Sequence, residues 1–136
     1  MRMEGSIGRP AKLKGKRVLV VEDEIFVSML VEDELRGAGA EVMGPAPSVS
    51  EALRLIEAAV ADGGGIGAAV LDINLEGRHV APVADRLAAL GVPFLFATGY
   101  GDDYDRGRHG AAPMLHKPFD SEKLIAAVEA LAPVAV

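Results

Sequence analysis

Short runs of apolar residues recur along the chain, and each is too short to form a helix of its own. The runs at 18–21, 68–73 and 93–97 are almost continuously apolar and do not alternate between apolar and polar residues. Such runs favour strands that are buried on both faces, as in parallel sheets. Shorter strands are predicted at 41–44, ended by Pro45 and Pro47, and at 113–116.

Between these runs, apolar residues recur every three or four positions, which predicts four amphipathic helices. Ser48 and Glu51 have the spacing of a capping box at the start of the second helix. We interpret Met29, Met43 and Met114 as core residues. The predicted apolar faces are Val27, Leu30, Val31, Leu35 and Ala38; Ala52, Leu53, Ile56, Ala59 and Val60; Val80, Val83, Ala84, Leu87 and Leu90; and Leu124, Ile125, Val128 and Leu131.

Residues 101–112 interrupt this rhythm because they offer almost no apolar face. We therefore expect the helix at this place, the fourth in chain order, to be short or mobile. Strands that alternate with helices indicate βαβ units. The sequence predicts an α/β fold: a doubly wound, five-stranded parallel sheet with helices on both faces, in a three-layer sandwich.

Length and composition agree with one globular domain. The 136 residues are 50% hydrophobic and 25% charged, which excludes wholesale disorder. The absence of cysteine excludes disulfides, a thiol nucleophile and cysteine-ligated metals. No apolar run is long enough to span a membrane, and the first residues lack the apolar segment of a secretory signal. We therefore expect a cytoplasmic protein that does not bind membranes.

Charge is distributed unevenly along the chain. Residues 1–17 hold six basic residues and one acidic residue, whereas the rest of the chain holds 8 basic and 19 acidic residues. A body this acidic repels phosphate backbones, so nucleic acid is not an expected partner. We interpret residues 1–15 as a flexible basic tail, residues 16–133 as the folded domain and residues 134–136 as its C-terminal end.

Polar residues follow the predicted strands at their carboxyl ends, where doubly wound sheets bind ligands. Glu22 and Asp23 follow the first strand, Asp72 the third, Thr98 the fourth and Lys117 the fifth. In the strand order 2-1-3-4-5 the first and third strands are neighbours, so their carboxylates meet. A like-charged pair about 4 Å apart costs roughly 4 kcal/mol at an effective dielectric constant near 20. A divalent cation among these oxygen ligands would remove that cost, and Mg²⁺ or Mn²⁺ is the expected cofactor.

The set Glu22-Asp23, Asp72, Thr98 and Lys117-Pro118 resembles the receiver domain of two-component response regulators, over residues 16–133. The resemblance implies a CheY-like (flavodoxin-like) fold with the strand order 2-1-3-4-5. It also implies that a histidine kinase or a histidine phosphotransfer protein is the phosphoryl donor. The implied roles are Asp72 as phosphoacceptor; Glu22, Asp23, Asp72 and the backbone carbonyl of Asn74 as metal ligands, Glu22 usually through water; Lys117, Thr98 and Gly99 as phosphate-binding groups; and a cis Lys117-Pro118 bond.

Two departures from the usual receiver pattern bear on signalling. Met114 occupies the position at which receivers carry a switch aromatic, whereas residues 94–100 resemble the FAT GUY subgroup of single-domain receivers from alphaproteobacteria. We therefore hypothesise that Tyr100 moves together with Thr98 upon phosphorylation, and Met114 is a third switch candidate. Residues 75–78, Leu-Glu-Gly-Arg, also replace the more usual sequence after the acceptor.

The predicted function is that of a stand-alone receiver in a phosphorelay. It would be phosphorylated on Asp72 in a Mg²⁺-dependent reaction, would not be an enzyme beyond self-catalysed phosphotransfer and autodephosphorylation, and would signal to an unidentified downstream protein. A hydrolase of the haloacid-dehalogenase type is an alternative, although it would need a second Asp where this chain has Asn74. A flavodoxin-like cofactor binder would need a phosphate-binding loop after the first strand, where acids stand instead. A phosphorylation-silent receiver that acts only by binding is the remaining alternative.

Overall fold

Five parallel strands form the centre of the protein. A computed structural model describes residues 11–99, 106–117 and 120–131. The strands are β1 (Arg17–Val21), β2 (Glu41–Ala46), β3 (Ala68–Asp72), β6 (Phe94–Thr98) and β7 (Met114–His116), and their order in the sheet is β2-β1-β3-β6-β7. All four pairings are parallel. The doubly wound fold predicted from the sequence is therefore confirmed, including the strand order.

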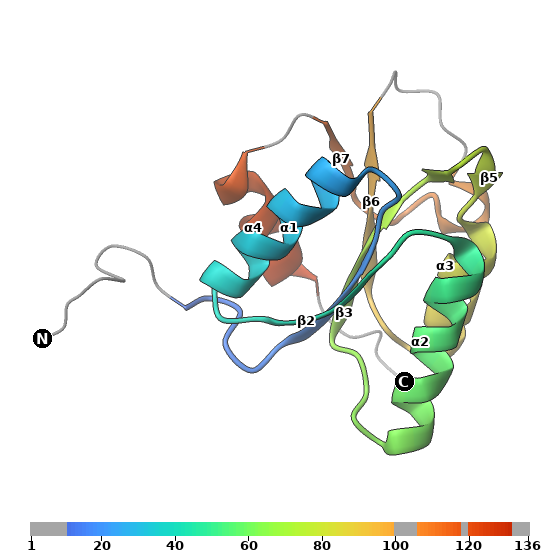
Figure 1. The fold of residues 1–136 in the computed structure, drawn as a ribbon, viewed down its shortest axis with the longest axis horizontal. Coiled ribbons are helices and arrows are strands. Elements are labelled where there is room, and N and C mark those ends of the chain that lie inside the picture. Colours follow the sequence, from blue (N-terminus) through green and yellow to red (C-terminus); the bar gives the residue numbers. More distant parts are fainter. Residues whose placement is uncertain (1–10, 100–105, 118–119, 132–136) are drawn as a thin grey trace, which may run out of the picture.

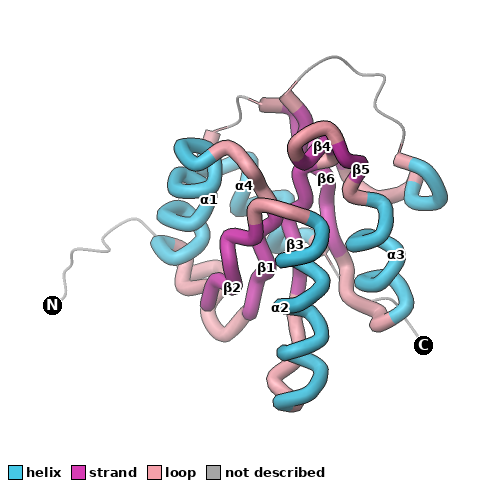
Figure 2. The backbone as a smooth tube through the Cα atoms, turned by 45° about the vertical axis from the view of Figure 1, so that its right-hand side comes forward, coloured by secondary structure: helices cyan, strands magenta, loops and turns pink. Residues whose placement is uncertain are grey.

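Helices cover both faces of this sheet in three layers (Figure 1). Helices α1 (Ile25–Gly37) and α4 (Ser121–Ala130) lie on one face, and α2 (Val49–Asp62) and α3 (Ala81–Ala89) lie on the other (Figures 1 and 2). Strand side chains point alternately to the two faces. In β1, Val18 and Val20 join the core under α1 and α4, whereas Leu19 and Val21 join the core under α2 and α3. Burial on both faces explains why the strand sequences are continuously apolar.

Local signals in the sequence determine where the helices begin and end. Ser48 is the N-cap of α2, and its side chain accepts a hydrogen bond from the backbone N–H of Glu51 at 3.2 Å, as the capping-box spacing predicts. Pro82 lies in the first turn of α3. Gly63 ends α2 with a φ of +77°, in the left-handed region that glycine adopts readily.

The apolar face of α1 is narrower than the sequence predicts. Val31, Leu35 and Ala38 are buried, but Leu30 is 50% exposed and Met29 is 53% exposed. The buried residues follow one another at intervals of four and three, and Leu30 lies about 100° around the helix from Val31. The interpretation of Met29 as a core residue is therefore wrong, whereas Met43 is buried and Met114 packs against the core.

Two boundaries also differ from expectation. Strand β2 does not end before Pro45 but continues to Ala46. This is possible because β2 is an edge strand, and its register with β1 shifts at this point. At the N-terminus, Leu13 is 1% exposed and its N–H donates to the carbonyl of Ala38 at 2.9 Å. Leu13, within the predicted tail, thus contacts the folded domain; residues 1–10 of that predicted tail lie outside the described residues.

The connection between β6 and β7 contains, among its described residues, one short 3₁₀ turn, η1 (Gly107–His109). His109 Nε2 lies 2.8 Å from Asp85 Oδ1 of α3, and its ring packs edge-on against Phe94. The prediction of a short fourth helix is therefore confirmed.

Within the described part of the chain, no helix is long and apolar enough to cross a membrane.

Candidate functional site

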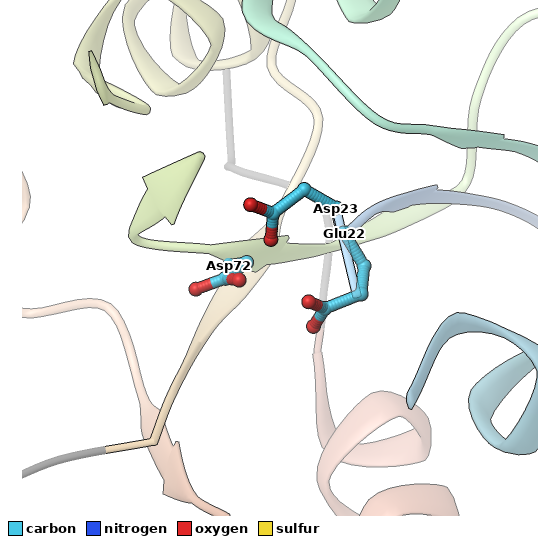
Figure 3. Close-up of side chains that lie close together, drawn as sticks. All are labelled: Glu22, Asp23 and Asp72. Carbon is cyan, nitrogen blue, oxygen red and sulfur yellow. The ribbon is translucent and has the colours of Figure 1, made fainter. Parts of the chain in front are cut away.

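The acidic residues predicted to meet do so at the carboxyl ends of β1 and β3. Strands β1 and β3 pair in parallel, with Val21 opposite Leu71, so Glu22 and Asp23 follow β1 beside Asp72, the last residue of β3. Each of these acids offers a carboxylate oxygen, and the three oxygens lie within 4.8 Å of one another. Figure 3 shows the three side chains converging from the two strands.

A cavity of about 210 Å³ opens beside these carboxylates. Most of the residues predicted for the site line this cavity. Glu22 does not, because it is buried and only 5% exposed. Three lining residues, Glu24, Glu76 and Gly77, are not among the residues predicted for the site. Glu24 directly follows the acidic pair Glu22-Asp23, and Gly77 is a residue type that favours turns, so both could have been included from the sequence. The lining residues are Asp23, Glu24, Asp72, Asn74, Glu76, Gly77, Thr98, Gly99 and Lys117.

Lys117 brings one ammonium group to this acidic site. Its Nζ lies 2.7 Å from Oε1 of Glu22, 3.4 Å from Oδ2 of Asp72 and 3.5 Å from Oε1 of Glu24. Its closest partner in this structure is thus Glu22, not Asp72. The Lys117 side chain is 12% exposed and that of Glu22 is 4% exposed, so removal of the ammonium would leave buried carboxylates without a counter-charge.

The crowding of charges changes the protonation of this site. Burial and the adjacent Glu22 carboxyl raise the pKa of Asp72 to about 7, although the Lys117 ammonium and the Asn74 N–H oppose the change. Burial alone would lower the pKa of Lys117, but the carboxylates of Glu22 and Asp72 outweigh it and the pKa is raised. Lys117 therefore stays charged near neutral pH, whereas Asp72 is only partly ionised there, and a further positive charge nearby would favour the loss of its proton.

Backbone N–H groups orient each of the three carboxylates. Glu24 N–H donates to Oε2 of Glu22 at 3.1 Å. Asn74 N–H donates to Oδ1 of Asp72 at 3.3 Å, and Glu76 N–H donates to Oδ2 of Asp23 at 2.9 Å. These donors come from segments directly after β1 and β3, so the strand ends provide both the carboxylates and part of their support.

The remaining predicted residues differ in their places: two line the cavity, one packs against the core and two lie outside the described residues. Thr98 ends β6 and is 1% exposed, and its carbonyl accepts a hydrogen bond from the Lys117 N–H at 2.7 Å. Gly99 follows it at the cavity wall. Met114 is partly buried against the core, opposite Phe96 in the sheet register. Tyr100 and Pro118, and with Pro118 the predicted cis bond, lie outside the described residues.

The donor set fits a small, hard divalent cation. Each of the three converging acids offers an oxygen atom, and oxygen ligands suit Mg²⁺ and Mn²⁺. A cation there would also supply positive charge to the two buried carboxylates of Glu22 and Asp72 and to the half-buried carboxylate of Asp23, beyond the single ammonium of Lys117.

Comparison with known proteins decides the family. Residues 18–129 match the response regulator receiver domain. The chain belongs to the response regulator receivers. Receivers are signalling domains that interact with histidine kinases or phosphotransfer proteins, and they bind Mg²⁺ at an acidic pocket.

Some relatives of this receiver match over nearly their whole length and others over only part of it. The transcriptional regulatory protein PdtaR of Mycobacterium tuberculosis is 31% identical over 118 residues, which are 84% of this chain and 55% of PdtaR. This chain therefore spans about half the length of that curated relative. Among solved structures, SdrG from Sphingomonas melonis Fr1 is 40% identical with a TM-score of 0.68, and the match covers 83% of this chain and 95% of SdrG.

Two further structures extend the comparison. A structure of SdrG in a BeF3-activated conformation is similar as well, with a TM-score of 0.66 and 38% sequence identity. The match covers 89% of this chain and 98% of the SdrG chain. The response regulator PhyR from Brucella abortus has a TM-score of 0.71 over 88% of this chain and 49% of its own, but at 24% identity this similarity concerns the fold alone.

Proposed function

We propose that this receiver accepts a phosphoryl group from a phosphohistidine onto Asp72, with Mg²⁺ or Mn²⁺ as cofactor. The observation that carries the proposal is the convergence of Glu22, Asp23 and Asp72 within 4.8 Å, with the Lys117 ammonium 3.4 Å from Asp72. Asp23, Asp72 and the backbone carbonyl of Asn74 would hold the cation, and Glu22 would act through water. The bound cation would supply positive charge to the acceptor and to the phosphoryl oxygens.

Asp72 is the nucleophile in the proposed step. One of its carboxylate oxygens forms a bond to phosphorus while the P–N bond of the donor's phosphohistidine breaks, and the electron pair of that bond leaves with the imidazole nitrogen. The products are an acyl phosphate on Asp72 and a histidine without phosphate. Its raised pKa means that Asp72 must lose a proton to react near neutral pH, and a nearby positive charge favours that loss.

Groups around the cavity would stabilise the charge on the transferred phosphoryl oxygens. Lys117 would move its ammonium from the carboxylates to the phosphate, because its side chain is flexible. The carboxylate oxygens that Nζ now contacts, on Glu22, Glu24 and Asp72, all lie within 3.5 Å of it. The Thr98 hydroxyl and the backbone N–H groups of Gly99 and Asn74 would donate hydrogen bonds. Thr98, with Tyr100 or Met114, would report the modification to the surface beyond β6 and β7.

The donor's docking surface must adjoin the cavity, because its phosphohistidine has to reach Asp72. Apolar side chains in the first two turns of α1, directly after the cavity residue Glu24, are exposed: Ile25 is 66%, Phe26 83%, Met29 53% and Leu30 50% exposed. Exposed apolar groups of this kind are typical of protein-binding surfaces. They support a histidine kinase or a histidine phosphotransfer protein as the partner; the downstream protein is unidentified.

The chemistry at Asn74 argues against the phosphohydrolase alternative. A haloacid-dehalogenase-like enzyme needs a general acid two residues after its nucleophile, and an amide cannot fill that role. Asn74 Oδ1 instead accepts a hydrogen bond from the Gly77 N–H at 2.9 Å and so supports the local turn.

Incubation with phosphoramidate or acetyl phosphate tests the proposed function. Intact-mass measurement should show one phosphoryl group per chain with Mg²⁺, none with a chelator, and none in the Asp72→Asn variant. The matched control Asp85→Asn, at an acid of α3 outside the cavity, should be labelled like the unsubstituted protein. Continuous release of phosphate without a stable adduct would instead favour a hydrolase, and no reaction at all would favour a phosphorylation-silent receiver.

A further inference from the structure

A small hairpin next to the cavity makes a tight turn that the sequence pattern of receivers did not predict. Strands β4 (Asn74–Leu75) and β5 (Arg78–His79) pair in antiparallel fashion, so Glu76 and Gly77 form the two-residue turn (Figure 2). Both turn residues have positive φ, +54° for Glu76 and +83° for Gly77. Two successive positive φ angles are the signature of a type I′ turn.

The conformation of Glu76 is costly. Glycine adopts positive φ readily, but for a residue with a long side chain the left-handed region costs roughly 1–2 kcal/mol. Within the described ranges, Glu76 is the one non-glycine residue with positive φ. Such local strain persists only where the surrounding structure imposes it.

The base of the hairpin is anchored in the hydrophobic core. Leu75 is 2% exposed and packs in the cluster under α2 and α3. Directly after the hairpin, Val80 N–H donates to the carbonyl of Ile73 at 2.8 Å. Within the turn, Gly77 N–H donates to Oδ1 of Asn74 at 2.9 Å. The base of the hairpin is therefore fixed relative to the end of β3, and so is the direction in which its tip points.

The tip of the hairpin contacts the candidate metal ligand Asp23. The Glu76 N–H lies at the turn and donates to Oδ2 of Asp23 at 2.9 Å, across 53 positions in the sequence. An oxygen of Asp23 lies within 4.8 Å of oxygens of Glu22 and Asp72, so without this bond electrostatic repulsion would favour rotation of its carboxylate away from them. A donor on one of its oxygens counteracts that rotation.

We infer that the β4–β5 hairpin is a positioning element: the Glu76 N–H, presented by the left-handed turn, holds the Asp23 carboxylate in its ligating orientation and thereby sets the affinity of the site for a divalent cation. This inference rests on the proposed function, because it concerns the same cation. Groups that orient a metal ligand commonly change metal affinity by about 10–100-fold when they are lost.

Two glycine substitutions separate positioning from stability. A Cβ on Gly77 would meet no heavy atom within 4 Å, and the same is true of Gly91, which follows α3 with a φ of +74°. Gly77→Val and Gly91→Val thus impose the same kind of backbone strain without a steric clash. Gly77 lies in the turn whose Glu76 N–H contacts Asp23, and Gly91 lies outside the cavity lining. Both should lose similar stability in urea unfolding without metal, whereas Gly77→Val alone should lose about tenfold in affinity for Mn²⁺ or Mg²⁺ in calorimetric titration.

A rescue variant and a second measurement complete the test. Gly77→Asn should recover most of the lost affinity, because asparagine tolerates the left-handed conformation. Independently of these variants, the Glu76 amide should be protected from hydrogen exchange in the metal-free protein and should lose that protection in Asp23→Ala. Equal metal affinity of Gly77→Val and Gly91→Val, or an unprotected Glu76 amide, would overturn the inference while leaving the proposed function intact. Absence of cation binding by the unsubstituted protein would overturn both.

Discussion

Replacement of Asp72 with Asn should stabilise the protein when no divalent cation is present and the pH is near 8. The reason is the pKa of Asp72, which burial and the Glu22 carboxyl raise from 3.8 to about 7 in the folded state. Below both pKa values the carboxyl is protonated in the folded and the unfolded chain, and its effect on stability vanishes. As the pH rises from about 4 to about 7, the unfolded chain loses this proton first, so the free energy of unfolding falls.

The size of the effect follows from the same two pKa values. Each pKa unit corresponds to about 1.4 kcal/mol, so the ionised Asp72 destabilises the metal-free fold by up to about 4 kcal/mol above pH 7. Asparagine has almost the same shape and carries no charge, but it also loses the attraction of the Lys117 ammonium 3.4 Å away. We therefore expect a net gain of about 2–4 kcal/mol for Asp72→Asn at about pH 8.

Urea unfolding with a chelator at two pH values measures this gain. It should shrink to less than about 1 kcal/mol at about pH 4, because that pH lies close to the pKa of 3.8 in the unfolded chain and ionisation there has only begun to favour the unfolded state. Asp33→Asn, at an exposed acid of α1, is the matched control and should change stability by less than about 0.5 kcal/mol at either pH. If Asp72→Asn gave no gain near pH 8, or an equal gain at both pH values, the reasoning about this carboxyl would be refuted.

Three further predictions concern other parts of the site. Lys117→Ala should lower the free energy of unfolding by about 3–5 kcal/mol at neutral pH in chelator, because it leaves Glu22 and Asp72 buried without their ammonium; a loss below about 1 kcal/mol in urea unfolding would contradict this. Phe26→Ser should slow phosphotransfer from a histidine-bearing protein donor by about tenfold or more, while the rate with acetyl phosphate stays unchanged. The reason is that Phe26 is 83% exposed and follows the cavity residue Glu24 by two positions; equal slowing with both donors would count against a docking role. Tyr100→Ala should leave Asp72 phosphorylation intact but abolish the difference in partner affinity between the phosphorylated and unphosphorylated forms, and a preserved difference would eliminate Tyr100 as the switch residue.

The parts of the fold that the sequence predicted are those in which burial imposes a pattern. Val18–Val21 are buried on both faces, so the strand had to be continuously apolar, and the Ser48 cap is a local interaction with its own spacing signal. The β4–β5 hairpin was missed because strands of two residues are too short to show any periodicity. The face of α1 was predicted too wide, because an apolar residue such as Leu30 looks the same in a sequence whether it packs inside or remains exposed for a partner.

The candidate site was predictable as a set of residues but not as a set of contacts. Topology alone brings the ends of β1 and β3 together, so the meeting of Asp23 with Asp72 followed from the strand order. The closer approach of Lys117 to Glu22 than to Asp72 depends on side-chain packing and on the burial of Glu22, which no spacing reveals. The support of Asp23 by a backbone N–H likewise involves no side chain of Glu76 and leaves no trace in composition.

Locating the phosphoryl group is the most direct test of this account. After reaction with phosphoramidate and Mg²⁺, borohydride converts an aspartyl phosphate to homoserine, and tandem mass spectrometry of the digested protein identifies the converted residue. We expect homoserine at position 72 and aspartate at positions 23 and 85. Conversion at another acid, or an unmodified position 72 in protein that carries label, would contradict it.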